Sequence, residues 1–183
     1  MCMELAKILH QRWYWDQIQS EVIIWQDNRQ LDFELDIRNF FVNPRNEELQ
    51  QIIQVLKQDS SAPYYEAEMV KACVWWVQHN IISKPDKTEF WQFPFETLAK
   101  RTGDCEDKAI LLANLLLASG VESWKVRLNV GMTNAGSHCW VTWFDGQEWI
   151  PLDFIACEYE EIYFSWHAQK AFTKTENIEA WNE

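Results

Sequence analysis

Three residues that can together activate a thiol lie in one segment of the chain, from Gly103 to Asp153. Cys105 opens an apolar, helix-like stretch, where unpaired backbone N–H groups and the positive end of the helix dipole favour a thiolate. His138 lies in an aromatic-rich run, and Asp153 ends the next one. A cysteine beside a histidine that an aspartate orients is the arrangement of an activated thiol nucleophile.

The stretch that contains the cysteine reads GDCEDKAILLANLLLASG and has the start and stop signals of a helix. Asp104 suits the N-cap position, and Asp107 is a weak acidic version of the second member of a capping box. Leucine, isoleucine and alanine then recur at helical spacing as far as Gly120, which is typical of a helix end. We therefore expect a largely buried helix with Cys105 in its first turn.

The histidine and the aspartate lie on a predicted β-hairpin. An Asp-Gly dipeptide separates the runs SHCWVTWF and QEWIPLD, and this dipeptide between apolar runs favours a two-residue turn. Such a turn pairs Phe144 with Gln147, and the same register places His138 directly opposite Asp153. Opposed Cβ atoms on one face lie about 4.5–5.5 Å apart, so we expect the imidazole and the carboxylate to form a hydrogen bond.

The patterns before this segment predict an N-terminal extension of helices and a strand. Apolar spacing predicts helices over residues 3–18 and 44–58, the second with Asn43 as its N-cap. Alternating apolar and acidic residues predict a strand over residues 31–37, with the acidic side facing solvent. A nearly all-apolar run predicts a deeply buried helix from Tyr64 to about residue 81.

The chain has no repeat, low-complexity segment or linker, so we expect a single domain over residues 1–183. Its core is expected over about 64–166, with the extension over 1–63. A further strand is predicted over 162–166, and residues 173–183 are expected to form a loose acidic tail.

The composition excludes several classes of partner. The formal net charge of −12 argues against nucleic acid or an anionic membrane, and no apolar run is long enough to span a bilayer. The N-terminal residues lack the continuous apolar region of a signal peptide. Five cysteines without a regular framework favour reduced thiols, so we expect a cytoplasmic protein; the oligomeric state stays open.

The same motifs resemble the transglutaminase-like superfamily. That family has a helix-start cysteine in a G-x-C-x-D-x-A-x-L pattern, a histidine in an H-x-W strand and an aspartate after the next strand. The resemblance covers about residues 69–153 and implies a Cys105–His138–Asp153 catalytic triad. It also implies an α+β, papain-like core, with the cysteine helix packed on an antiparallel β-sheet. Cys139 stands where a small or apolar residue is commoner.

The expected chemistry is thiol acyl transfer on an amide or peptide carbonyl. The backbone N–H of Cys105 would contribute to the oxyanion hole, and Gln92 (side-chain amide) or Trp91 (indole N–H) is the candidate for a second donor. Hydrolysis by a cysteine peptidase or amidase is favoured over cross-linking by a transglutaminase, because water needs no second binding site. The expected partner is a protein or peptide substrate, with no cofactor and no metal.

Three alternatives accompany this interpretation. The chain could be a catalytically silent protein- or peptide-binding module that keeps the fold and uses a tryptophan-rich cleft. A zinc site could use His138 together with Cys105, Cys139 and Cys157. The chain has no C-x-x-C pair, however, which is the usual spacing of zinc-binding cysteines. Asp104 and Glu106 could bind calcium, although acidic residues that stabilise a helix N-terminus are the commoner case.

Overall fold

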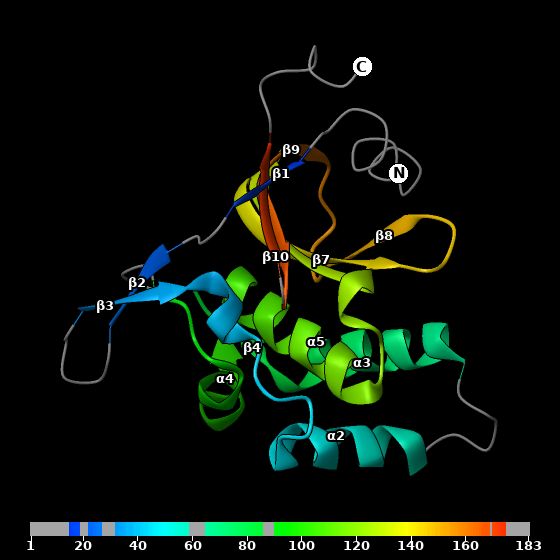
Figure 1. Cartoon of the computed structure of the whole chain (residues 1–183). Helices are drawn as coiled ribbons and strands as arrows, with labels where there is room; N and C mark the ends of the chain where they lie inside the picture. Colours follow the sequence, from blue (N-terminus) through cyan, green and yellow to red (C-terminus); the bar gives the residue numbers. More distant parts are fainter. Residues whose placement is uncertain are drawn as a thin grey trace.

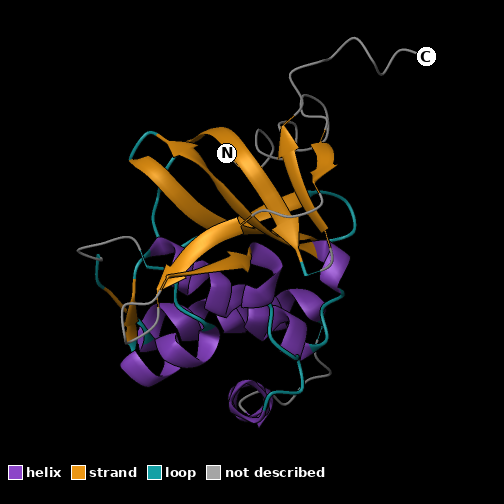
Figure 2. Cartoon of the chain, turned by 60° about the vertical axis from the view of Figure 1, so that its left-hand side comes forward, coloured by secondary structure: helices purple, strands orange, loops and turns teal. Residues whose placement is uncertain are grey.

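A layer of helices packs against one face of an antiparallel β-sheet (Figures 1 and 2). The computed structural model describes residues 15–18, 22–26, 32–58, 65–85, 90–168 and 170–174. The described strands form a six-stranded sheet in the order β1-β10-β9-β6-β7-β8, and every neighbouring pair in it is antiparallel. The bounds are β1 Trp15–Ile18, β6 Val126–Thr133, β7 Gly136–Phe144, β8 Trp149–Leu152, β9 Tyr159–His167 and β10 Lys170–Lys174.

The helix that begins at the cysteine, α5 (Cys105–Ser119), lies at the centre of the molecule. It contacts β6 and β7 on one side and the other helices elsewhere, namely α2 Glu47–Gln58, α3 Glu66–Asn80 and α4 Pro94–Lys100. Every residue from Glu106 to Ala118 is buried. A helix that is surrounded in this way needs apolar residues on all sides, which explains the nearly unbroken leucine-rich run in its sequence.

Strand β7 shows the alternation that a sheet between two environments requires. Cys139, Val141 and Trp143 face the main core, which is built around α5. Trp140 points to the opposite face, where it forms a smaller buried cluster with Trp149 and Ile162. The prediction of an α+β fold with the cysteine helix on an antiparallel sheet is confirmed.

Two short pairings and two 3₁₀ segments complete the described elements. Strand β2 (Val22–Gln26) pairs antiparallel with β3 (Asp32–Asp36), which confirms the strand predicted over 31–37. Strand β4 (Ile82–Ser83) runs parallel to β5 (Thr102–Gly103), directly before α5. The 3₁₀ segments are η2 Ile37–Phe40 and η3 Ser123–Lys125.

Two predictions about the N-terminal extension are wrong within the described residues. Residues 15–18 form a strand instead of the end of a helix, because β1 pairs with β10 from the far end of the chain. Helix α2 begins at Glu47 because Asn46, and not Asn43, supplies its cap. The Asn46 side-chain oxygen accepts the backbone N–H groups of Glu48 and Leu49 at 3.0 and 3.2 Å. Residues 3–14 and 175–183 lie outside the described part.

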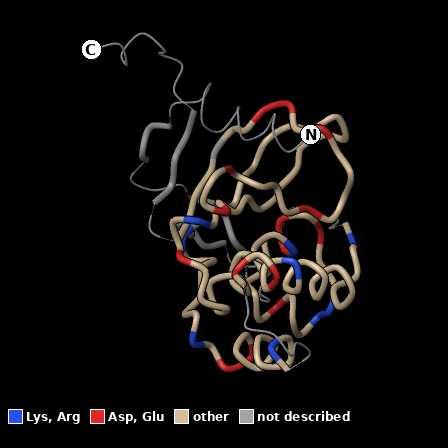
Figure 3. Tube along the Cα trace, turned by 90° about the vertical axis from the view of Figure 1, so that its right-hand side faces the viewer, with Lys and Arg blue, Asp and Glu red and all other residues tan. Residues whose placement is uncertain are grey.

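Basic and acidic positions alternate through the described part of the fold. Figure 3 shows Lys and Arg positions along the trace, with Asp and Glu positions among them. None of the described helices combines the length and the apolar character that crossing a membrane requires.

Candidate active site

Cys105 is the first residue of α5, and Asp104 is the N-cap residue, as the sequence predicted. The Asp107 side chain accepts the backbone N–H of Asp104 at 3.4 Å. This bond satisfies one of the donors that a helix start otherwise leaves unpaired. The thiol therefore has a fixed place in the first turn, where the helix dipole is positive.

A buried cluster around Asp107 holds this helix start in position. Asp107 is fully buried and accepts the backbone N–H of Gln92 at 2.7 Å and also the Gln92 side-chain amide. A Cβ atom added to Gly103 would lie 2.5 Å from the Asp107 Cβ, so only glycine permits this close approach. The residues just before the nucleophile are therefore packed too tightly for any other side chain at position 103.

The charge state of the thiol differs from the sequence-based prediction of a thiolate. Burial, followed by the neighbouring Glu106, raises the pKa of Cys105 to about 12, and the backbone of Cys139 opposes this rise. The Cys105 thiol donates a hydrogen bond to Glu106 Oε2 at 3.1 Å. In the absence of substrate, burial and the neighbouring carboxyl group therefore favour the protonated thiol.

Glu106 is itself unusual, because it is a carboxyl group with only 5% of its surface exposed. Burial and then the nearby Asp104 raise the pKa of Glu106 to about 9, since two carboxylates in one small volume resist double ionisation. Its Oε1 atom is buried and has no hydrogen-bond partner among the described residues. Carboxylate oxygens of Asp104, Glu106 and Asp107 all lie within 4.8 Å of one another.

His138 and Asp153 form the predicted hydrogen bond, with Nε2 of the imidazole 2.8 Å from Oδ2 of the carboxylate. His138 is 8% exposed and lies on β7, and Asp153 directly follows β8. With Nε2 engaged by the aspartate, Nδ1 is the ring nitrogen that remains for a proton transfer.

The predicted register of the hairpin is wrong, although its functional consequence is right. Phe144 pairs with Trp149 and not with Gln147, so the loop comprises residues 145–148. The Asp145 side chain accepts the backbone N–H groups of Gln147 and Glu148, which stabilises this longer loop. The register moves by two residues, and a shift of two keeps every side chain on its face of the sheet. Asp153 is therefore diagonal to His138, within reach of its ring.

Tyr159 belongs to the site, although the sequence analysis did not identify this residue. Its hydroxyl donates to Asp153 Oδ2 at 2.9 Å, and the backbone N–H of Phe154 donates to Oδ1 at 2.6 Å. The Tyr159 ring packs on Trp140 with centroids 4.7 Å apart, and Trp140 lies beside the His138 ring at 6.1 Å. The aspartate is thus oriented from β9, a strand whose pairing no local pattern connects to the hairpin.

The three residues of the predicted triad line one pocket of about 180 Å³. Its other lining residues come from β4 and the loop after it, from the start of α5 and from the segment after β8: Ser83, Lys84, Pro85, Asp104, Lys108, Phe154 and Ile155. Cys105 also lies close to the β7 backbone, which influences its pKa through Cys139. The pocket therefore brings a thiol, an imidazole and a carboxylate to the same surface.

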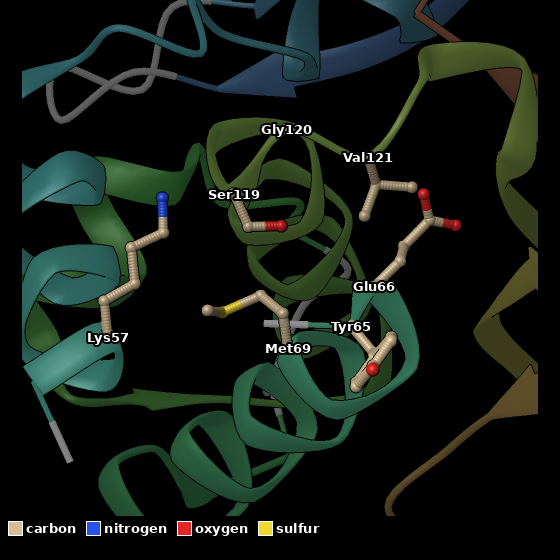
Figure 4. Close-up of a pocket in the computed structure, with 7 residues that line it drawn as sticks. All are labelled: Lys57, Tyr65, Glu66, Met69, Ser119, Gly120 and Val121. Atoms are coloured by element: carbon tan, nitrogen blue, oxygen red, sulfur yellow. The ribbon is translucent and has the colours of Figure 1, made fainter. Parts of the chain in front are cut away.

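A second pocket, of about 300 Å³, lies at the other end of α5 and has different chemistry. Figure 4 shows its lining from α2, from the start of α3 and from the C-terminal end of α5. Its carboxylate, Glu66, already accepts the Lys125 ammonium at 3.1 Å and the Trp143 indole N–H at 3.0 Å. The pocket lacks a cysteine or a histidine.

Neither candidate for the side-chain oxyanion donor lines the pocket of Cys105. The Gln92 side-chain amide donates to Asp107 and, at 3.4 Å, to the carbonyl of Thr102, so its hydrogens already have acceptors. The Trp91 ring packs between Phe40 and Trp166 in the core. We therefore correct the assignment of Gln92 and Trp91, whose described contacts are structural.

The four cysteines in the described part of the chain do not gather as a zinc site would require. Cys139 belongs to the buried core on the α5 face of the sheet. Cys157 instead lies near the triad, with its thiol 3.7 Å from Asp153 Oδ2. Among the described residues, the potential ligand group that contains a thiol consists of His138, Asp153 and Cys157, and not of the four residues considered from the sequence.

Two solved structures of one known protein agree with this fold. Legionella pneumophila LapG is similar in structure, with a TM-score of 0.57 and 16% identity over 73% of this chain and 88% of that one. A calcium-bound structure of the same protein has a TM-score of 0.56 and 19% sequence identity, over 72% of this chain and 80% of that one. A Cytophaga hutchinsonii protein described as a candidate cysteine protease has a TM-score of 0.48 and 15% sequence identity, over 88% of this chain and 68% of that one.

A comparison with curated protein sequences finds no match. A family model does match, over residues 50–154, a range that contains all of α5, the hairpin and the three triad positions. This range exceeds half of the chain and includes the region in which the motifs were recognised. The chain belongs to the transglutaminase-like superfamily.

Proposed function

We propose that the chain is a thiol-dependent acyl-transfer enzyme that hydrolyses an amide or peptide bond, with Cys105 as nucleophile. The observation that carries this proposal is the 2.8 Å hydrogen bond from His138 to Asp153, in the same pocket as a helix-start cysteine. Each residue alone has an ordinary structural explanation. Together they supply a nucleophile, a base and the group that orients the base.

In the proposed mechanism, His138 Nδ1 takes the thiol proton as the sulfur attacks the carbonyl carbon. Asp153 holds the Nε2–H and stabilises the imidazolium that forms. The tetrahedral intermediate then collapses, the C–N bond breaks, and the leaving amine takes the proton from His138. Water attacks the resulting thioester with His138 again as base, which releases the carboxylic acid and restores the thiol.

The raised pKa of Cys105 favours general-base activation over a preformed thiolate–imidazolium pair. The proton would leave the thiol only as the carbonyl approaches, when the new C–S bond removes negative charge from sulfur. The backbone N–H of Cys105, at the helix start, would be one donor to the developing oxyanion. We name no side chain as the second donor.

A peptide-library cleavage profile tests the proposal, with Cys105→Ala as the control that removes only the nucleophile. Cleavage by the wild-type chain and not by the variant is expected. A lysine-containing peptide added to the same reaction separates the two acyl acceptors, because an isopeptide product would mark transamidation. If no peptide is cleaved or joined and Cys105 reacts with alkylating agents no faster than Cys73, the silent binding module is the better description.

A second property that the first turn of α5 supports is calcium binding by Asp104 and Glu106. Ca²⁺ prefers carboxylate and other oxygen ligands, and Glu106 contributes a buried oxygen that has no described partner. Asp107 is less suited, because both its oxygens already accept N–H groups. A bound cation would supply positive charge beside the thiol. This proposal replaces the sequence-based expectation that no metal is involved.

A further inference from the structure

Lys108 is a buried cation in the pocket of the nucleophile that the proposed mechanism does not use. Only 4% of its surface is exposed, although lysine is almost never buried without a partner. It lines the same pocket as Cys105 and His138. Cys105 and Lys108 are three residues apart on α5, so their side chains leave the same face of the helix, with Cβ atoms about 5–6 Å apart.

The protein compensates this charge only in part: burial lowers the pKa of Lys108, and the negative charge of Asp153 opposes that effect. The Lys108 ammonium donates to the Ser83 hydroxyl at 2.9 Å and lies 4.5 Å from the centre of the Phe154 ring. Among the described residues, no carboxylate lies within 4.0 Å of it as an ion-pair partner. An ammonium has three N–H donors, and Ser83 is the acceptor that the described structure offers to them.

The nearby carboxylates are committed elsewhere. Asp153 accepts His138, Tyr159 and the Phe154 backbone N–H. Asp104 caps α5 and faces Glu106. A buried charge without a direct ion pair among the described residues costs free energy unless a ligand of opposite charge completes it.

We propose that Lys108 forms a carboxylate-binding subsite next to Cys105, so that the preferred substrates carry a carboxylate close to the scissile amide. This inference rests on the proposed function, since it assigns the specificity of that site. The carboxylate can belong to an acidic side chain or to the C-terminus of a peptide, because both present the same two oxygens to the ammonium. The Phe154 ring and Ser83 hold the ammonium in place for either.

The test compares two small alkylating agents that differ in charge. Iodoacetate carries a carboxylate and iodoacetamide does not, and peptide mass spectrometry measures the rate of each at Cys105 in the full chain. EGTA is present, so that no bound cation supplies the positive charge. Lys108→Met should lower the iodoacetate-to-iodoacetamide rate ratio roughly tenfold, the usual effect of losing a hydrogen bond to a charged group.

Lys71→Met is the matched control, because it removes the same charge at an exposed position on α3 outside the pocket. The ratio should be unchanged in Lys71→Met, and Lys108→Arg should retain most of the wild-type ratio. A ratio that falls equally in the Lys71 and Lys108 variants, or in neither, overturns the subsite. The iodoacetamide rate alone, compared with that of a His138→Ala variant, reports on the nucleophile, so failure of the proposed function is recognised separately.

A second measurement uses only the wild-type chain and identifies the source of the carboxylate. Three peptides are tested for protection of Cys105 against iodoacetamide: one with Glu and an amidated C-terminus, one with Gln and a free C-terminus, and one with Gln and an amidated C-terminus. Stronger protection by the first assigns side-chain recognition, and stronger protection by the second assigns terminal recognition. Equal protection by all three contradicts the proposal.

Discussion

The Cys105 thiol differs from a free cysteine because burial and Glu106 favour its protonated form. A raised pKa means that the folded chain keeps the proton at pH values where an exposed thiol, with a pKa of about 8.5, has lost it. Without substrate we therefore expect alkylation of Cys105 to accelerate steadily from pH 7 to pH 10 without levelling off. Timed iodoacetamide labelling in EGTA measures this profile.

Glu106→Gln should make that alkylation faster at pH 9–10, by roughly threefold or more, because it removes a like charge about 3 Å from the sulfur. Glu68→Gln, at an exposed position on α3, makes the same change in net charge and should have no effect. A wild-type profile that levels off below pH 8 would show that the thiol is activated in the resting chain.

Asp153 determines which nitrogen of His138 carries the proton. Asp153→Asn should preserve the fold and reduce kcat, by less than the factor of about 10⁴ seen in a serine triad, because a cysteine–histidine pair can use an asparagine orienter. Steady-state kinetics on a cleaved peptide, with circular dichroism to verify folding, measures the change. Unchanged turnover would make Asp153 a structural residue.

Tyr159 orients Asp153 and is not expected to contact substrate. Tyr159→Phe removes one hydrogen bond and keeps the ring on Trp140, so kcat should fall about fivefold to tenfold while KM stays constant. Tyr163→Phe, on the same strand at an exposed position, is the matched control. A change in KM with no change in kcat would argue against a positioning role for Tyr159.

At the scale of elements, the start of α5 depends on the contact between Gly103 and Asp107. Gly103→Ala should destabilise the chain by roughly 2 kcal/mol or more, because the new methyl group meets a fully buried side chain. For a chain of this length that corresponds to a fall in Tm of about 4–8 °C, which differential scanning calorimetry resolves. Gly146→Ala is the comparison: its surroundings are open and its φ is +107°, so it reports the backbone cost of an added methyl group without a steric contact.

The predictions from sequence succeeded where local chemistry determines the structure. The ends of α5 follow from Asp104 and Gly120, and the face shared by His138 and Asp153 follows from the period of a strand. A shift of register by an even number of residues keeps each side chain on the same face of the sheet. The contact between His138 and Asp153 was therefore predictable, although the length of the hairpin loop was not. The predicted contact between His138 and Asp153 was thus less sensitive to an error in register than the predicted pairing of the hairpin residues.

The predictions failed where distant segments decide the structure. Gln92 serves Asp107 instead of the pocket, and Tyr159 reaches Asp153 from β9. The strand at residues 15–18 exists through its pairing with β10. None of these contacts has a signature in the nearby residues, because each depends on how the sheet and the helix layer come together.

At the scale of the whole molecule, a cation at the helix start should stabilise the fold. Calcium that binds the folded chain and not the unfolded one raises Tm, by an amount that grows with its concentration. We expect a rise of several degrees between EGTA and about 1 mM CaCl₂, and little rise in Glu106→Gln. Magnesium serves as the control ion, since it demands a smaller octahedral site. Equal Tm values in EGTA and calcium would contradict the assignment.

The pairing of β1 with β10 has a consequence for synthesis of the chain on the ribosome. These two strands come from opposite ends of the described chain, and Trp15 lies opposite Lys174. During translation β1 emerges before β10 and stays without its partner until the chain has been made as far as residue 174. Until β10 emerges, β9 also presents an unpaired edge, which is a template for association between nascent chains. Ribosomal stalling before residue 170 should therefore yield aggregation-prone fragments.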